Sequence, residues 1–292
     1  MTKLVQQKRQ YKAKTDDLDL TSPIEVVVVY VTEKGANCRL LAGEGVVTVR
    51  APEVWELVPG EIAKVMPHKQ RRYAGRLSIT GDILSTRLDL PLLGLVPLRL
   101  ESRGIWNPQD EYWGEDGEPL DDWARQTIAW GTRPEYEMQQ VLPLDGPDGP
   151  DADPILIANE LKDAGDYTGA WHILMTLCES DVRCLDAHAH LGNLVFNHSH
   201  RTENALRHYE AGLRIGELSL GSLGDGVLPW GWIDNRPFLR CMMGFGLCLW
   251  RLGRFEEAEP VFDRIRWLNP TDAPGVRFNL AEVRARRKWK AG

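Results

Sequence analysis

The sequence predicts an α+β protein of two domains, a small antiparallel β-barrel followed by an α-helical solenoid. Three observations support this prediction. Residues 23–100 contain short β-branched runs separated by Gly, Pro and Asn, which is typical of a small barrel or sandwich. Residues 151–288 show a helical apolar pattern that recurs about every 34 residues, which is typical of stacked helical hairpins. A stretch rich in Pro, Gly and Asp at 143–154 separates the two patterns and predicts a linker.

The N-terminal residues 1–21 change from basic to acidic, so we expect a flexible tail there. They contain no apolar run, and no secretory signal is therefore predicted. The barrel domain is expected over residues 22–100. Its strands are expected at 24–31, 39–41, 46–49, 61–65, 75–79 and 97–100.

A basic cluster with one aromatic ring lies in the middle of the barrel domain: His68, Lys69, Arg71, Arg72 and Tyr73. Lys and Arg can neutralise phosphates, and a tyrosine ring can stack on a base. The surrounding stretch 58–77, which opens with Pro-Gly-Glu, resembles the TRAM-type oligonucleotide-binding (OB) fold. The resemblance implies an OB-like barrel with single-stranded nucleic acid as its partner. The alternative is a solvated basic hairpin on an unrelated barrel.

Residues 101–153 form an acidic, Trp-rich segment and linker. They hold three Lys or Arg against fourteen Asp or Glu, so this segment accounts for the net charge of −7. One amphipathic helix is expected at 119–130. The adjacent carboxylates Asp121 and Asp122 fit a solvated helix face better than acid–base chemistry.

The helical pattern is clearest at 239–270. Gly246 and Ala258 allow two helix backbones to approach closely, Gly253 permits a tight turn, Phe262 fills the space between helices, and Pro270 ends the second helix. This spacing resembles the tetratricopeptide repeat family. Weaker copies lie at 151–184 and at 185–219, which has one extra residue near its turn, and a capping helix is expected at 273–288. We therefore expect a repeat domain over 154–292, with an insertion at 220–237.

The resemblance implies a concave groove lined by the first helix of each hairpin, and a non-catalytic adaptor that binds a protein or peptide there. Asn can hold a peptide backbone and Arg can hold a carboxylate. The alternative is that these residues only solvate the inner face. The groove residues expected from the register are Asn159, Lys162, Asn193, Asn197, Arg240, Trp250, Arg277 and Arg284.

The insertion contains Trp230, Trp232 and Arg236. Its sequence is similar to stretches in bacterial repeat proteins, and that similarity implies no activity. Exposed Trp and Arg often anchor interfaces, so these residues are candidate partner contacts. The alternative is that they pack the insertion onto neighbouring helices.

The sequence contains none of the short motifs that mark nucleotide-binding loops, nucleophile elbows or zinc proteases, so neither an enzyme nor a cofactor is predicted. Six histidines lie between 172 and 208, but their spacing completes no ligand set, and no metal site is predicted. Five dispersed cysteines fit a reduced, cytoplasmic protein. No apolar run reaches the ~18 residues of a membrane span, so no membrane partner is expected. The runner-up function is an RNA- or DNA-binding accessory protein whose repeats recruit a partner.

Overall fold

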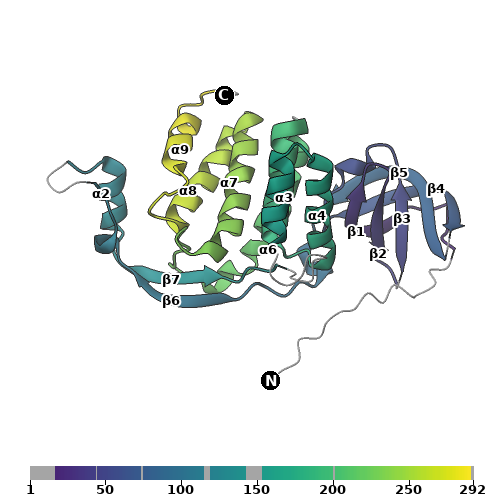
Figure 1. The fold of residues 1–292 in the computed structure, drawn as a ribbon, viewed down its shortest axis with the longest axis horizontal. Helices are drawn as coiled ribbons and strands as arrows, with labels where there is room; N and C mark the ends of the chain where they lie inside the picture. The colour runs from purple at the N-terminus through teal and green to yellow at the C-terminus, as the bar shows by residue number, and fades with distance from the viewer. Residues whose placement is uncertain are drawn as a thin grey trace, which may run out of the picture. The chain divides into compact units, whose positions relative to one another are not determined.

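The computed structural model describes residues 17–43, 45–73, 75–114, 119–142, 153–199 and 201–290. The chain divides into two compact units, Met1–Leu93 and Gly94–Gly292. The first is a β-barrel and the second is mainly helical (Figure 1), so the predicted α+β class is confirmed, with the barrel first in the chain. Residues 94–100, which were expected in the barrel domain, fall in the second of these units.

Five strands form the barrel: β1 (Ile24–Thr32), β2 (Gly35–Leu40), β3 (Val46–Arg50), β4 (Ile62–Tyr73) and β5 (Arg76–Arg87). A 3-10 turn η1 (Val54–Glu56) follows β3, and a short helix α1 (Leu90–Leu93) follows β5. The strands pair in the order β1-β2-β3-β5-β4, and β4 closes the ring on β1.

The barrel is not wholly antiparallel as predicted, because β3 and β5 pair in parallel. The other pairings are antiparallel. In a closed ring of five strands the directions cannot alternate all the way round, so at least one neighbouring pair must be parallel. The prediction was wrong on this point because it considered strands singly and not their closure.

Every second side chain along a barrel strand points inward, and these side chains fill the barrel. Val47 and Val49 of β3 and Leu77 and Ile79 of β5 are almost completely buried. The residues between them on β3 and β5 lie on the outer surface, as expected for a period of two. Gly81 lies where β4 crosses closely, because a Cβ there would come within 2.2 Å of the Met66 carbonyl oxygen. The β-branched runs therefore specify the inner face of the barrel.

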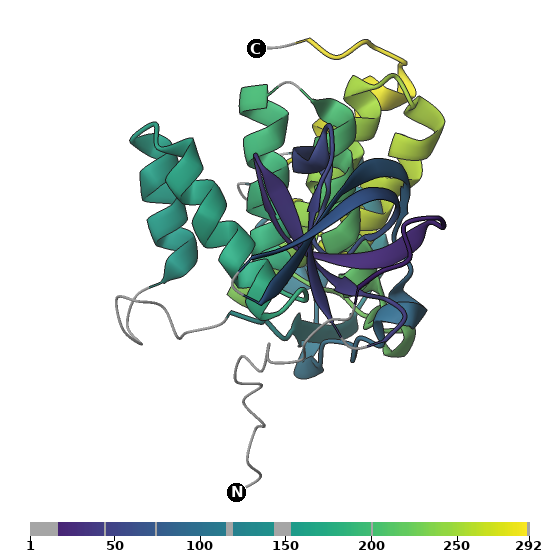
Figure 2. The same ribbon diagram turned by 90° about the vertical axis from the view of Figure 1, so that its right-hand side faces the viewer.

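The second unit contains three helical hairpins and a final helix, as expected from the recurrent helical pattern. The paired helices pack against each other, and each hairpin contacts the next (Figures 1 and 2). The helices are α3 (Pro154–Asp163) with α4 (Tyr167–Ser180), α5 (Leu185–Leu194) with α6 (Thr202–Glu217), α7 (Arg236–Arg251) with α8 (Phe255–Leu268), and then α9 (Val276–Arg284).

Small residues set the helix spacing as predicted from the sequence. A Cβ on Gly246 would lie 2.8 Å from the Phe262 ring, and a Cβ on Gly192 would lie 2.8 Å from the Tyr209 ring. Gly253 turns between α7 and α8 with φ of 75°, a conformation that favours glycine. The second and third hairpins therefore share one packing arrangement.

The extra residue of the second hairpin is accommodated in a π-helical turn, η3 (Val195–Ser199), at the end of α5. A π turn takes up one more residue than an α turn without breaking the helix. The sequence predicted one extra residue near the turn of this hairpin, and the π turn places it at the end of α5.

Residues 94–114 and 119–142 are folded and pack with the helices, with Arg133 bonded to three carbonyl groups of later segments. They contain β6 (Leu100–Trp106), η2 (Pro108–Asp110), α2 (Asp122–Ala129) and β7 (Arg133–Met138). The strands form an antiparallel pair that runs along the lower ends of the helices in Figure 1, and β7 bridges to Val227 of the insertion. The insertion itself contains η4 (Leu220–Ser222) and η5 (Ile233–Asn235). Among the residues described, no helix has both the length and the apolar character needed to cross a membrane.

Candidate functional site

The outer face of strands β2, β3, β5 and β4 carries a regular polar array. Residues paired across neighbouring strands point to the same side of a sheet. The pairings place Arg71 of β4 beside Ser78 of β5, Ser78 beside Thr48 of β3, and Thr48 beside Asn37 of β2. The Thr48 and Asn37 side chains are also hydrogen-bonded at 3.2 Å. One row of side chains therefore crosses four strands.

Two further rows flank this one. On one side Lys69, Thr80 and Arg50 are paired across β4, β5 and β3. On the other side Tyr73 is paired with Arg76, and Arg39 lies on β2 two residues from Asn37, on the same face. We call this surface the outer barrel face: Asn37, Arg39, Thr48, Arg50, Lys69, Arg71, Tyr73, Arg76, Ser78 and Thr80.

The outer barrel face is strongly cationic. Its five cations, Arg39, Arg50, Lys69, Arg71 and Arg76, are exposed. None of them forms an ion pair within the part of the chain that the structure describes. Tyr73 is 86% exposed, so its ring is open to a stacking partner. The three rows contain no carboxylate; the nearest one along β5 is Asp82, which His68 binds at 2.7 Å.

The predicted basic cluster is therefore split between two faces. Lys69, Arg71 and Tyr73 lie on the outer barrel face. Arg72 points to the opposite side, where its Nη2 donates to Asp17 at 2.9 Å, and His68 lies at a register shift and binds Asp82. Sequence reasoning missed Arg39, Arg50 and Arg76, which lie on β2, β3 and β5 and join this face through the strand order β4-β5-β3-β2.

The helical unit brings together some of the predicted groove residues. Asp186 on α5 is buried and accepts a hydrogen bond from Arg240 on α7 at 2.8 Å. His190 lies one turn along α5, 3.6 Å from the same carboxylate oxygen. Burial lowers the pKa of His190, Asp186 opposes this, and Arg240 and Lys162 of α3 add to the lowering. Successive inner helices thus place His190 and Arg240 at one carboxylate, with Lys162 close enough to affect the pKa of His190.

The other predicted groove residues have separate partners. Asn159 accepts from Lys162 at 3.1 Å, Asn193 hydrogen-bonds the buried Tyr209, and Asn197 is exposed.

The two arginines of α9 are held in internal ion pairs. Arg277 binds Asp272 at 2.9 Å with its guanidinium 4.4 Å from the Trp123 ring, and Arg284 binds Glu259 and Asp263.

Trp250 contacts the C-terminal end of the chain. Its indole Nε1 donates to the Arg287 carbonyl at 2.7 Å, and its ring meets Trp289 edge to face at 4.9 Å. Trp289 also meets Phe196 of η3, at 5.6 Å. Phe196 was missed in the sequence, although it occupies the same register position of the second hairpin, counted from Leu185, as Trp250 does of the third, counted from Leu239.

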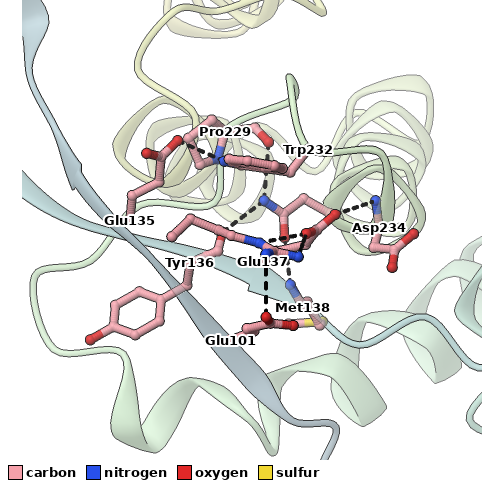
Figure 3. A network of polar contacts seen from close by, with 10 residues as sticks. Glu101, Glu135, Tyr136, Glu137, Met138, Pro229, Trp232 and Asp234 are labelled. Carbon is pink, nitrogen blue, oxygen red and sulfur yellow. Dashed lines mark hydrogen bonds and ion pairs between the residues drawn. The ribbon is translucent and has the colours of Figure 1, made fainter.

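The insertion is anchored to β6 and β7 by a polar network (Figure 3). Asn235 accepts from the Met138 amide at 2.8 Å and donates to the Tyr136 and Pro229 carbonyls. Trp232 donates to Glu135 at 2.8 Å, and the Arg103 guanidinium lies 4.9 Å from its ring. Trp232 is therefore engaged within the molecule.

The other two insertion residues, Trp230 and Arg236, contact each other. The Arg236 Nε donates to the Trp230 carbonyl at 3.0 Å, and the guanidinium lies 5.4 Å from the ring. Arg240 approaches the same ring at 5.8 Å. The insertion thereby places an aromatic surface next to the Asp186–Arg240 pair.

Two histidines of the helical unit and all five cysteines of the chain lie in the protein interior. His188 and His208 are completely buried, and burial lowers the pKa of both. All five cysteines are buried free thiols, and burial raises the pKa of each one above its usual value. Across the described ranges, no group of three or more His, Cys, Asp or Glu could hold a metal ion.

Comparison with known proteins gives no relative: no protein-family model matches this chain, and no curated protein shows significant similarity to it. Function therefore has to be inferred from the chemistry of the two surfaces, the outer barrel face and the inner face of the helical unit.

Proposed function

We propose that this protein binds single-stranded nucleic acid on the outer barrel face. The observation that carries the proposal is the set of five exposed cations that no described carboxylate pairs with, arranged around the open Tyr73 ring. By contrast, Arg240, Arg277 and Arg284 of the helical unit are each bound to a carboxylate. Cations without partners are available to phosphates.

The barrel topology supports an OB-like assignment. A closed five-stranded barrel is the OB architecture, and such barrels bind oligonucleotides on the face of strands 2 and 3 and on the loops 1–2 and 4–5. Here β2 and β3 supply Arg39 and Arg50, and the β4–β5 hairpin supplies Tyr73 and Arg76. The cationic and aromatic groups therefore lie where this class of barrel takes its ligand.

The chemistry of the face suits unpaired bases. The Lys and Arg heads neutralise phosphates, while Tyr73 stacks on one base with an expected contribution of about 1–3 kcal/mol. Thr48, Ser78 and Asn37 supply hydroxyl and amide groups in the middle row, and these can hydrogen-bond base or sugar edges. A duplex hides its base faces, so we expect a single strand to bind more tightly.

The test is fluorescence anisotropy with a labelled single-stranded oligonucleotide of mixed sequence. Replacing Lys69 and Arg71 together by Ala removes two phosphate contacts, and we expect binding to weaken about tenfold at low salt. The matched control is Arg72→Ala, which removes a neighbouring cation that faces the other side and binds Asp17. The control should bind as the wild type does.

Tyr73 gives a second comparison. Tyr73→Leu removes the ring and should weaken binding at least fivefold, whereas Tyr73→Phe retains stacking and should bind like the wild type. No binding by the wild type at low salt, or equal losses in Arg72→Ala and the double variant, would overturn the proposal.

We also propose a second function, the adaptor role suggested by the tetratricopeptide-like pattern. Its support is the inner face, where Arg240 pairs with the buried Asp186 and lies 5.8 Å from the Trp230 ring, and where Lys162 of the preceding hairpin lowers the pKa of His190. Because Arg240 is already paired, we take Lys162 as the contact for a carboxylate of the bound protein segment. The charge reversal Lys162→Glu should remove such a partner, whereas Arg214→Glu on α6, whose cation pairs with Glu217, should not. Equal partner binding by both variants would contradict this role.

A further inference from the structure

Phe196 and Trp250 occupy equivalent positions of two successive hairpins, and both rings contact the Trp289 ring. Phe196 lies in the π turn η3, and Trp250 lies near the C-terminal end of α7. The Arg251 side chain fixes the phenyl ring, because its Nη1 donates to the Phe196 carbonyl at 3.0 Å and its guanidinium lies 4.6 Å from the ring. Arg251 therefore links the π turn η3 to the end of α7, where Trp250 lies.

The C-terminal segment after α9 is directed onto this pair. The Arg286 amide donates to the Val283 carbonyl and the Arg287 amide donates to the Glu282 carbonyl, at 2.9 and 3.0 Å, which is the usual closing pattern of a helix. Arg286 adopts a left-handed backbone, with φ of 51°, where glycine is ordinarily found. Figure 2 shows the segment, in yellow, leaving α9 at the top of the view.

The segment binds by a backbone hydrogen bond and one aromatic anchor. Trp250 Nε1 donates to the Arg287 carbonyl at 2.7 Å. The Trp289 ring then meets Trp250 at 4.9 Å and 77° and Phe196 at 5.6 Å and 89°, which are favourable edge-to-face geometries. Lys288 and Lys290 flank the anchor and are exposed.

We propose that Phe196 and Trp250 are an acceptor site for an aromatic residue in an extended, basic segment of a partner protein, and that the C-terminal tail occupies this site in cis. The indole N–H of Trp250 donates a hydrogen bond to a backbone carbonyl of the bound segment, and the Phe196 and Trp250 rings contact its aromatic side chain. Glu256 and Glu282, which bind Arg286 and Arg287, favour basic residues before the anchor. This inference rests on the second proposed function, binding of a protein segment by the helical unit.

The tail contacts are weak enough to exchange. The Arg286–Glu256 pair has both side chains about two-thirds exposed, and such pairs contribute little. The left-handed backbone of Arg286 is unfavourable for a residue with a Cβ and therefore opposes docking. A tethered segment has an effective concentration of about 1 mM, so a tail with an intrinsic Kd of about 0.1 mM would weaken a competing segment roughly tenfold.

The test uses the full chain and a fluorescein-labelled peptide of the tail sequence Arg-Arg-Lys-Trp-Lys. Trp289→Ala should bind this peptide about tenfold more tightly than the wild type, because the site is vacated. The matched control Lys290→Ala changes an exposed tail residue outside the aromatic contacts and should bind as the wild type does. Trp289→Leu, which retains apolar bulk, should change affinity in the same direction as Trp289→Ala.

A second substitution locates the peptide. Adding Trp250→Phe to Trp289→Ala removes the indole donor while keeping a ring, and should weaken the peptide several-fold. The inference would be overturned if both Trp289 variants bound the peptide no more tightly than the wild type while their circular dichroism was unchanged. If Lys162→Glu still removed a partner in that case, the second proposed function would stand and only the assignment of Phe196 and Trp250 would fail.

Discussion

The buried His188 predicts that the helical unit loses stability as the pH falls. Its ring nitrogen Nε2 lies 3.0 Å from the Val182 carbonyl. Because a carbonyl only accepts, Nε2 carries the hydrogen, and the bare Nδ1 has no partner within the described structure. A proton added at Nδ1 would create a buried charge, so burial lowers the pKa of His188 from 6.5 to about 4.

The size and sign of the effect follow from this pKa. The unfolded chain takes up the proton near pH 6.5, whereas the folded chain resists it until about pH 4. The contribution of neutral His188 is therefore fully present above pH 6.5 and is lost as the pH falls. Over the whole interval the free energy of unfolding drops by about 3 kcal/mol, of which about 2 kcal/mol is lost by about pH 5.

The substitution His188→Gln isolates this contribution, because a glutamine amide can donate to the Val182 carbonyl without titrating. Urea unfolding followed by tryptophan fluorescence reports on the helical unit, since every tryptophan except Trp55 follows residue 93. Between about pH 8 and about pH 5, the wild type should lose about 2 kcal/mol more than the variant. His208 adds a loss to both proteins. Parallel losses in the two proteins would refute the reasoning.

Three further predictions concern the packing of the molecule. Gly244→Ala should lower the free energy of unfolding, measured in urea, by about 2 kcal/mol, because the added Cβ would lie 2.1 Å from the Tyr209 ring. Gly231→Ala places its Cβ in open space and should change this free energy by less than about 0.5 kcal/mol. Equal effects of the two substitutions would contradict the packing. Arg133→Met should lower the free energy of unfolding by about 3 kcal/mol, because it removes the donor that the Asp225, Gly226 and Trp267 carbonyls share. A change below about 0.5 kcal/mol would show that these hydrogen bonds do not stabilise the fold. An aromatic disulfide reagent should label none of the five buried cysteines in the native protein and all of them in denaturant; rapid native labelling would show that a thiol is exposed.

Local sequence patterns predicted most of the elements because those elements are locally determined. The β-branched run at 24–31 is β1, and the glycine and aromatic spacing at 239–270 is the α7–α8 hairpin. Strand pairing is not local, and here prediction failed. The stretch at 97–100 was assigned to the barrel, but β6 begins at Leu100 and pairs with β7, more than thirty residues along the chain. The parallel β3–β5 pairing was missed for the same reason.

The candidate site was predictable only where it is continuous in sequence. Lys69, Arg71 and Tyr73 lie on one strand, so they could be found together. Arg39 and Arg50 join them only because the barrel places β3 beside β5. The separation of Arg71 from Arg72 follows from strand alternation, which the sequence analysis did not apply to this cluster. Phe196 could have been found from the register, because it stands as far from Leu185 as Trp250 stands from Leu239.

The central claim is that the five exposed cations of the outer barrel face, which no described carboxylate pairs with, bind phosphates. Its most direct test is the salt dependence of the affinity for a single-stranded oligonucleotide, measured in parallel for the wild type, Lys69→Ala/Arg71→Ala and Arg72→Ala. Each phosphate contact contributes about 0.7 to the slope of log affinity against log salt. The account predicts that the double variant loses about 1.4 of this slope and that Arg72→Ala keeps the wild-type slope. A wild-type affinity that does not change with salt, or a slope that falls in Arg72→Ala as much as in the double variant, would contradict it.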